Sequence, residues 1–276
     1  MPHRASLDVP APVLRTVTGW IARHRRRPGA RPWQRAATVH HQVLLVLRWL
    51  RHRADLHTLA RDAGVSDATA YRYLHEALDV IAAHAPDLHD VLGAAHAAGL
   101  PYLCLDGTLI ATDRVAERVE VDGKPAHHLW FSGKHRIFGG NVQVLSEPGG
   151  FPLWVSDVRP GCSHDLTVAR ELVLPALYPY AARGLPALTD KGYTGAGIGV
   201  HTPIKRPAGS VLHPDNRTYN HRTYNQMITD LRAPTERANA LLGYWRALER
   251  VTVCPQRIGV IVAAALVLKS LMRGRW

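Results

Sequence analysis

The chain contains few cysteines and few aromatic residues. Only three of its 276 residues are cysteine, and aromatic residues make up 7% of the sequence. Cys104, Cys162 and Cys254 are far apart and form no Cys-x-x-Cys pair, so the sequence offers neither a disulfide framework nor zinc-finger spacing, despite its 17 histidines. We therefore expect the protein to work in a reducing cytoplasm.

Signatures of nucleotide binding and of membrane insertion are also missing. The run Gly195-Ala196-Gly197-Ile198-Gly199 has Val200 where a dinucleotide loop has its last glycine, and no Lys-Ser or Lys-Thr follows it, so we expect a turn and no nucleotide cofactor. The chain does not open with a basic stretch followed by a long apolar one. The apolar run from Ile258 to Leu268 is short for a bilayer span, which predicts a buried C-terminal helix packing on the sheet of the main domain and no membrane partner.

Acidic residues are scarce relative to basic ones. The chain has 22 Asp and Glu against 34 Lys and Arg, a net charge of +12, and residues 1–53 hold eleven arginines against one acid, Asp8. We interpret residues 1–37 as a basic arm that binds DNA phosphates, because each neutralised phosphate releases counterions. An arginine bias from GC-rich coding is the alternative. The candidate contacts in the arm are Arg23, Arg25, Arg26 and Arg27.

Residues 38–86 show the apolar periodicity of three short helices. The second helix breaks at Ala63-Gly64-Val65, and Ser66 is placed to cap the third. Two helices joined by a tight glycine-containing turn are typical of a helix-turn-helix domain, whose later helix enters the major groove. The alternative is a packing module without DNA contact. The candidate DNA contacts are the capping residue Ser66 and three positions that we expect to face solvent, Thr69, Arg72 and Tyr73.

After a linking helix at 87–100, the pattern changes to α/β. Short apolar runs at 102–105 and 187–189 meet glycines, which predicts buried strands that end at Asp106 and Asp190. Hairpins are expected around Asp122-Gly123 and Pro148-Gly149-Gly150, and a further strand at 201–204.

Two helices complete the expected α/β order. One begins after Ser163, which we take as its N-cap, and carries Asp165 in its first turn. The other extends from about residue 219 to 250 and presents Glu236, and Pro234 should kink or divide it.

Three acidic residues lie in separate local signatures, Leu105-Asp106-Gly107-Thr108, Asp190-Lys191-Gly192-Tyr193 and Arg232 to Arg237 around Glu236. Carboxylates are the ligands that hard Mg²⁺ prefers. Two such ions roughly 3.5–4 Å apart can clamp the attacking and leaving oxygens of a phosphodiester. The three signatures therefore predict a site that binds two Mg²⁺ or Mn²⁺ ions and cuts nucleic acid.

The order of these signatures resembles the DDE transposases of the bacterial IS5 type, within the Harbinger-related group, over roughly residues 38–272. The motifs that carry the resemblance are Asp106 to Thr108, Ser132 to His135, Gly140 to Val144, Pro160 to Asp165, Asp190 to Tyr193, and Tyr224-Asn225 followed by Glu236-Arg237.

The resemblance implies an RNase H-like catalytic domain at 101–276, with a mixed central sheet flanked by helices, preceded by an all-α helix-turn-helix domain at 38–86. Asp106, Asp190 and Glu236 would be its catalytic metal ligands, with Asp165 as the alternative second carboxylate. The residues that would hold DNA near the cut are Lys134, His135, Lys205, Arg206, Arg232, Arg237 and Arg246. Trp245 could stack on an unpaired base or, as we rather expect, lie in the core.

The resemblance implies an insertion-sequence transposase that works at the bacterial nucleoid. It would bind double-stranded terminal inverted repeats and target DNA, cut and transfer strands, and assemble as a dimer or larger complex. Two positions depart from the family pattern, Thr229 where a Tyr is frequent and Gly243 where a Lys is frequent, with Tyr224 and Arg246 as candidate replacements. These departures favour one alternative, a silenced DNA-binding regulator, and a stand-alone metal-dependent nuclease that cuts without joining is the second.

Overall fold

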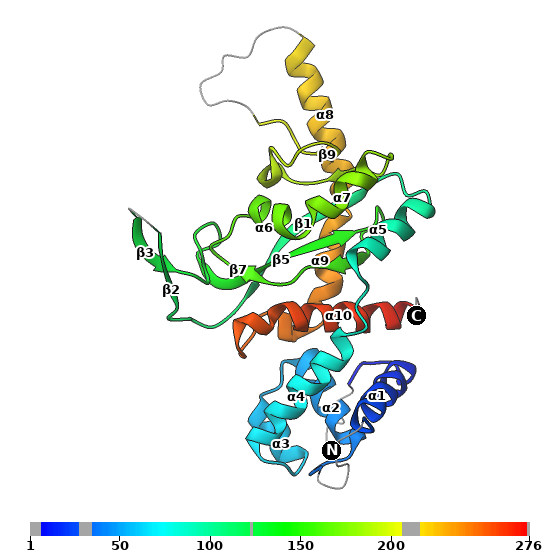
Figure 1. Cartoon of the computed structure of the whole chain (residues 1–276), viewed down its shortest axis with the longest axis vertical. Helices are drawn as coiled ribbons and strands as arrows, with labels where there is room; N and C mark the ends of the chain where they lie inside the picture. Colours follow the sequence, from blue (N-terminus) through cyan, green and yellow to red (C-terminus); the bar gives the residue numbers. More distant parts are fainter. Residues whose placement is uncertain (1–6, 28–34, 122–123, 206–215, 275–276) are drawn as a thin grey trace, which may run out of the picture. The chain divides into compact units, whose positions relative to one another are not determined.

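The computed structural model describes residues 7–27, 35–121, 124–205 and 216–274 of the chain (Figure 1). It divides into two compact units. Unit 1 combines Met1–Ala85 with Leu242–Trp276, and unit 2 is Pro86–Leu241. Each unit is considered separately.

Unit 1 is helical. Its helices are α1 (Ala11–Arg25), α2 (Val39–His52), α3 (Leu56–Asp62), α4 (Asp67–Ala82) and α10 (Ile258–Arg273), with short 3₁₀ turns at Arg246–Leu248 and Pro255–Arg257. The helix α4 is central, since α1, α2, α3 and α10 all pack against it.

The three helices expected in residues 38–86 are present as α2, α3 and α4. Each begins at a side-chain cap: Thr38 accepts from the His41 amide, Asp55 from Thr58 and Ser66 from Thr69. Such caps satisfy amides that have no partner within the helix. Gly64, in the turn between α3 and α4, has φ +65°, a conformation that glycine adopts without strain. The capping role expected for Ser66 is thus confirmed.

Three candidate DNA-contacting residues of unit 1 are buried, contrary to expectation. Tyr73 and Thr69 are 3% and 8% exposed. Tyr73 completes the buried stripe of α4 beside Ala70, Leu74 and Ala77, so helical periodicity places its ring in the core. Arg25 is 6% exposed, because its guanidinium donates to the Ala37 carbonyl at 3.0 Å and to Gln42 Oε1 at 2.6 Å. Arg25 and Tyr73 thus bind neighbouring segments of unit 1, and all three side chains are largely covered by protein.

The C-terminal helix α10 belongs to unit 1. We expected it to pack on the main sheet, but it packs against α4, and Arg257 just before it donates to Asp79 Oδ1 of α4 at 2.7 Å. With its preceding turn the helix covers Pro255–Arg273, which is 19 residues long and apolar enough to cross a membrane by length and composition. However, 56% of its most apolar window is buried inside the protein, as in the core helix of a folded domain.

Unit 2 is built on a mixed sheet. Its main strands run in the order β6 (Pro152–Val155), β5 (Ile137–Ser146), β1 (Leu103–Ala111), β8 (Ala187–Leu188) and β9 (Val200–His201). The strand β5 is antiparallel to both of its neighbours, β6 and β1, whereas β8 is parallel to β1 and β9 is parallel to β8. Two short strands, β4 (Phe131–Ser132) and β7 (Arg159–Pro160), also pair with β5. A separate hairpin joins β2 (Arg118–Val121) and β3 (Lys124–His128).

Helices cover both faces of the sheet (Figure 1). On one face, Leu103, Leu105 and Ala187 contact α5 (Leu88–Ala97), α6 (Asp165–Leu172) and α7 (Leu174–Ala181). On the other, Cys104 and Leu188 pack against Ile228 of α8 (Asn216–Arg232). Because successive side chains of a strand point to opposite faces, odd positions of β1 face α6 and even positions face α8.

Most elements expected in unit 2 are present, with two differences. The strand β1 does not end at Asp106 but continues to Ala111, because β5 pairs with it along this whole length. The helix α6 has His164 at its N-cap rather than Ser163, and no side chain caps it. As expected, the long helix around Pro234 is divided, into α8 and α9 (Thr235–Gly243), which fits the missing amide of proline. The hairpin turn at 122–123 lies outside the described residues.

Candidate active site

Two of the three predicted ligands belong to neighbouring parallel strands: Asp106 lies within β1, and Asp190 follows the end of β8. In the register of β1 and β8, Leu103 pairs with Ala187 and Cys104 with Leu188. Two residues further along each strand come Asp106 and Asp190, so the two carboxylates lie side by side at the edge of the paired region. The Asp190 carboxylate also accepts from the Gly192 amide at 2.8 Å, which fixes the turn that follows β8.

Asp106 is held by two residues from the α8–α9 region. Its side chain is 22% exposed, and Arg232 Nη2 lies 3.6 Å from Oδ1. Asn239 donates through Nδ2 to Oδ2 at 3.3 Å, while its Oδ1 accepts from the Thr108 hydroxyl at 2.8 Å. Because the carboxylate can only accept, it faces the Nδ2 side of the amide, and the Thr108 hydroxyl donates to the Oδ1 side and holds the amide in place. Asn239 was not among the sequence candidates, although it lies three residues after Glu236, on the same side of α9.

The charge balance around Asp106 favours a cation. Burial raises the pKa of Asp106 from 3.8 to about 6, against the opposing effects of Arg232 and Asn239, and the negative charges of Asp190 and Asp165 raise it further. Burial of a carboxylate without full compensation is unfavourable to its charged form. At neutral pH this site is therefore short of positive charge.

Asp165 joins the same electrostatic cluster from the opposite face of β1. A Cβ on Gly107 would lie 2.7 Å from Asp165 Cγ, so only a glycine at this position lets the carboxylate come so close to the strand. Its Oδ1 accepts from Asn141 Nδ2 at 2.7 Å, and its Oδ2 lies 3.2 Å from Lys134 Nζ. Both oxygens of Asp165 are thus already engaged by protein groups.

A buried chain of hydrogen bonds extends from Asp165 to the turn after Asp190. Gln143 Nε2 donates to Asn141 Oδ1 at 2.9 Å, and Tyr193 donates through its hydroxyl to Gln143 Oε1 at 2.6 Å. Burial, together with the charges of Asp165, Asp106 and Asp190, raises the pKa of Tyr193 well above its ordinary value, so Tyr193 remains a donor at neutral pH. Together with the Lys134–Asp165 ion pair, these hydrogen bonds connect four of the sequence motifs, at 132–135, 140–144, 160–165 and 190–193.

Glu236, the third predicted ligand, is the second residue of α9 and is exposed. It lies four residues after Arg232 and three before Asn239, the two residues that contact Asp106. The start of α9 is seated on the turn between β5 and β6, where Gly150 has φ +77° and a Cβ would lie 3.1 Å from Arg237 Cβ. Among the described residues, no three His, Cys, Asp or Glu side chains are arranged to hold a metal ion.

The other sequence candidates are divided between the two units. In unit 2, Lys134, His135, Lys205 and Arg237 are exposed, and Arg206 lies outside the described residues. Arg246 belongs to unit 1, where its Nε donates to Glu249 at 3.0 Å. Trp245 is fully buried, which confirms its expected place in the core.

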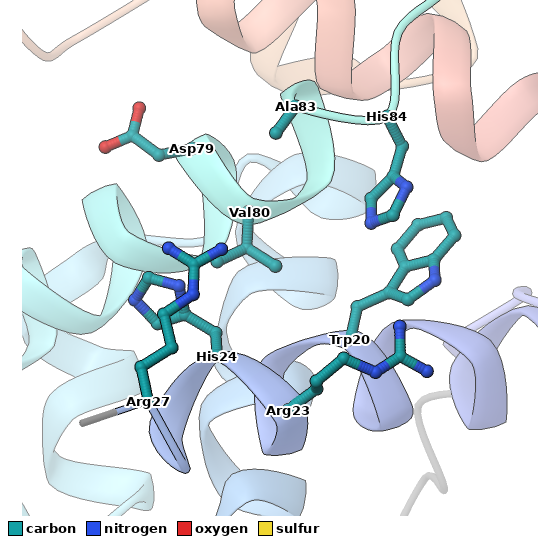
Figure 2. A pocket seen from close by; sticks show the side chains of 8 residues that line it. All are labelled: Trp20, Arg23, His24, Arg27, Asp79, Val80, Ala83 and His84. Carbon is teal, nitrogen blue, oxygen red and sulfur yellow. The ribbon is translucent and has the colours of Figure 1, made fainter. Parts of the chain in front are cut away.

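The exposed basic candidates of unit 1 lie on α1 and α4. Arg72 is exposed and donates to the Thr69 hydroxyl at 2.9 Å. Arg23 and Arg27 line a pocket between α1 and α4, in which the rings of Trp20 and His84 stack at 3.7 Å (Figure 2). Arg26 is exposed directly after α1.

The comparison with protein families identifies a family model that matches this chain. The sequence model of the family described as DDE superfamily endonuclease matches residues 105–269, which is more than half of the chain and includes all four carboxylates of this region. No match was found among curated proteins or among solved structures. The match shows that this chain belongs to the DDE superfamily endonuclease family.

Proposed function

We propose that the protein is an insertion-sequence transposase of the IS5 type, which cuts transposon ends and joins them to target DNA. The observation that carries the proposal is the pairing of β1 with β8, because it sets Asp106 beside Asp190. The residues Arg232 and Asn239, on either side of Glu236 in the sequence, contact the same Asp106. The family is one of endonucleases, and its membership supports DNA as the substrate.

The strand order of unit 2 supports an RNase H-like core. If β1, β5, β6, β8 and β9 are taken as the five main strands, β8 is the fourth in the chain. In an RNase H-like order the second catalytic carboxylate follows the fourth strand, and Asp190 is in that position. Asp165, whose two oxygens bind Asn141 and Lys134, is the weaker candidate.

The donors present suit Mg²⁺ or Mn²⁺, which DDE endonuclease domains generally use. They are carboxylate oxygens, and the raised pKa of Asp106 shows that a positive charge would be favourable beside it. Asp106, Asp190 and Glu236 would hold two ions. When bound, the metal would activate the attacking hydroxyl and stabilise the charge on the departing oxygen. In this scheme Thr108 and Asn239 hold Asp106 in one orientation. The series of hydrogen bonds from Asp165 to Tyr193 stabilises the turn after Asp190.

Recognition of the terminal repeats is assigned to unit 1. The helices α3 and α4 follow the helix-turn-helix order, and Arg72 is exposed near the N-terminal end of α4, where base contacts are made in such domains. Arg23, Arg26 and Arg27 would add phosphate contacts. Pairing of two transposon ends calls for at least a dimer, assembled on DNA in the cytoplasm.

One alternative, a silenced DNA-binding regulator, is favoured by the two departures from the family pattern. Thr229 donates its hydroxyl to the Asn225 carbonyl of its own helix at 2.7 Å. The candidate replacements are engaged elsewhere, since Tyr224 packs against the Cys104–Leu188 cluster and Arg246 pairs with Glu249. In a regulator of this kind, binding to the repeats would persist without cutting.

The test is cutting and joining of DNA that carries the inverted repeats flanking the protein's own gene. With Mg²⁺, the wild-type protein should cut at the repeat ends and join them to a target plasmid. Asp106→Asn should bind the repeats with unchanged affinity and fail to cut. Asp230→Asn, an exposed acid on α8, is the matched control and should cut normally. Binding without cutting by the wild-type protein would favour the regulator, and cutting without joining would favour a stand-alone nuclease.

A further inference from the structure

A cavity of about 540 Å³ lies directly beside the carboxylate cluster, in unit 2. Its walls come from β3, β4, β5 and the loop before α6, and Asp165 is shared between the cavity and the cluster. The volume is within the range of small-molecule sites, about 300–1,000 Å³, and is far too small for duplex DNA. It suits one unpaired nucleotide.

The side chains that line the cavity are aromatic and basic, the types with which other proteins bind single-stranded nucleic acid. Phe131 lines it with 37% of its surface exposed, and its ring is held edge-on against Phe138 at 5.2 Å. A ring held rigidly and exposed on one side can stack on any base. Cationic and donor groups come from Lys134 and from four histidines, whereas the one acid in the lining, Asp165, is already paired with Lys134.

We propose that this cavity holds one unpaired nucleotide of the DNA strand that flanks the cleaved phosphodiester. The base stacks on Phe131, and Lys134 with His135 binds the neighbouring phosphates. The inference rests on the proposed function, and it adds a feature of the substrate, which must be locally single-stranded next to the cut.

The first experiment measures affinity without catalysis. The full chain in EDTA binds a repeat duplex that ends in a five-nucleotide thymidine tail, or the same duplex with an abasic tail, and fluorescence anisotropy gives both dissociation constants. We expect the thymidine tail to bind about 5- to 150-fold more tightly, the range for loss of one stacked base. Phe131→Ala should remove most of this ratio.

The control is Ile137→Ala, which removes another exposed apolar side chain from the paired β4 and β5 strands without lining the cavity. It should keep the wild-type ratio. Equal affinity of the wild-type protein for the two tails would overturn the proposal, as would an unchanged ratio in a folded Phe131→Ala variant.

A second readout locates the tail. With 5-iododeoxyuridine in the tail, irradiation should crosslink it to the segment 127–138 of the wild-type protein, as identified by peptide mass spectrometry. Crosslinks found only in α1 to α4 would refute the cavity as the site. The two proposals fail separately, because a protein that prefers the thymidine tail but never cuts would retain the cavity and lose the transposase assignment.

Discussion

At the scale of single residues, three consecutive positions of β1 have three different roles. Asp106 supplies the carboxylate, Gly107 leaves room for Asp165 on the other face of the strand, and Thr108 orients the amide of Asn239. The alternation of side chains along a strand explains why residues 106 and 108 act on one side and residue 107 on the other. This division of roles accounts for the Asp-Gly-Thr motif.

The raised pKa of Asp106 makes stability depend on pH. Because the folded-state pKa, about 6, lies above the ordinary value of 3.8, the folded state binds the proton more tightly, and stability falls as pH rises from about 4 through 6. Between pH 5 and pH 8 the loss should be about 1 kcal/mol. Urea unfolding in EDTA should show this difference between wild-type protein and Asp106→Asn. Identical pH dependence in the two proteins would contradict the burial of this charge.

Gly107→Ala tests the close approach of Asp165. The new Cβ would displace a carboxylate that Asn141 and Lys134 hold, so we expect a loss of about 1–3 kcal/mol of stability, as for an overpacked site, and slower cutting. Gly133→Ala is the control, since a Cβ there meets no atom within 4 Å. Thermal unfolding of both variants gives the comparison, and similar melting temperatures would show that the space at Gly107 is not needed.

At the scale of elements, the site depends on how α9 is placed against the sheet. The helix begins after the break at Pro234, and its first turn rests on Gly150 in the turn between β5 and β6. From there α9 brings Asn239 to Asp106 and carries Glu236 at its start. The position of Glu236 is thus set by a glycine 86 residues earlier in the chain.

Gly150→Ala should displace the start of α9 from the turn between β5 and β6. The residue has φ +77°, and a Cβ would come within 3.1 Å of Arg237 and closer to the Pro234 carbonyl, so backbone must shift. We expect a loss of about 1–3 kcal/mol and a cutting rate reduced at least tenfold. Gly149→Ala is the matched control, because its nearest contact would be ordinary, at 3.6 Å. Equal cutting rates of the two variants would show that the position of Glu236 does not depend on the contact between α9 and Gly150.

The sequence predicted local elements well and tertiary neighbours poorly. Apolar runs next to glycines located β1, β8 and the hairpin of β5 and β6, because those signals are local. The sequence did not predict the burial of Tyr73 and Arg25, because side chains with both apolar and polar parts can lie inside or at the surface. Here distant partners decide: Gln42 binds Arg25, and the Ala37 amide donates to the Tyr73 hydroxyl. Asn239 was missed because its partner Asp106 is 133 residues away.

At the scale of the whole molecule, the surplus of basic over acidic residues and the carboxylate cluster belong to different units. The exposed arginines of α1 and its C-terminal end lie in unit 1, and the carboxylate cluster lies in unit 2. The salt-dependent part of DNA affinity should therefore respond to substitutions in unit 1, and DNA cutting to substitutions of the carboxylates.

Substituting both Arg23 and Arg27 by alanine should weaken binding to all DNA sequences. The slope of log K against log salt should become about 2 units shallower, about one for each phosphate that is no longer neutralised. Arg183→Ala, an exposed arginine after α7 in unit 2, should leave the slope unchanged. Fluorescence anisotropy at several salt concentrations would measure the slope. An unchanged slope in the double variant would show that Arg23 and Arg27 do not contact DNA.

The most direct test of the central claim compares Asp190→Asn with Asp165→Asn in single-turnover cutting of repeat ends with Mg²⁺. If Asp106 and Asp190 form the metal site and Asp165 steadies it, Asp190→Asn should show no cutting, while Asp165→Asn should cut slowly but measurably. Cutting by Asp190→Asn at the wild-type rate would contradict the assignment.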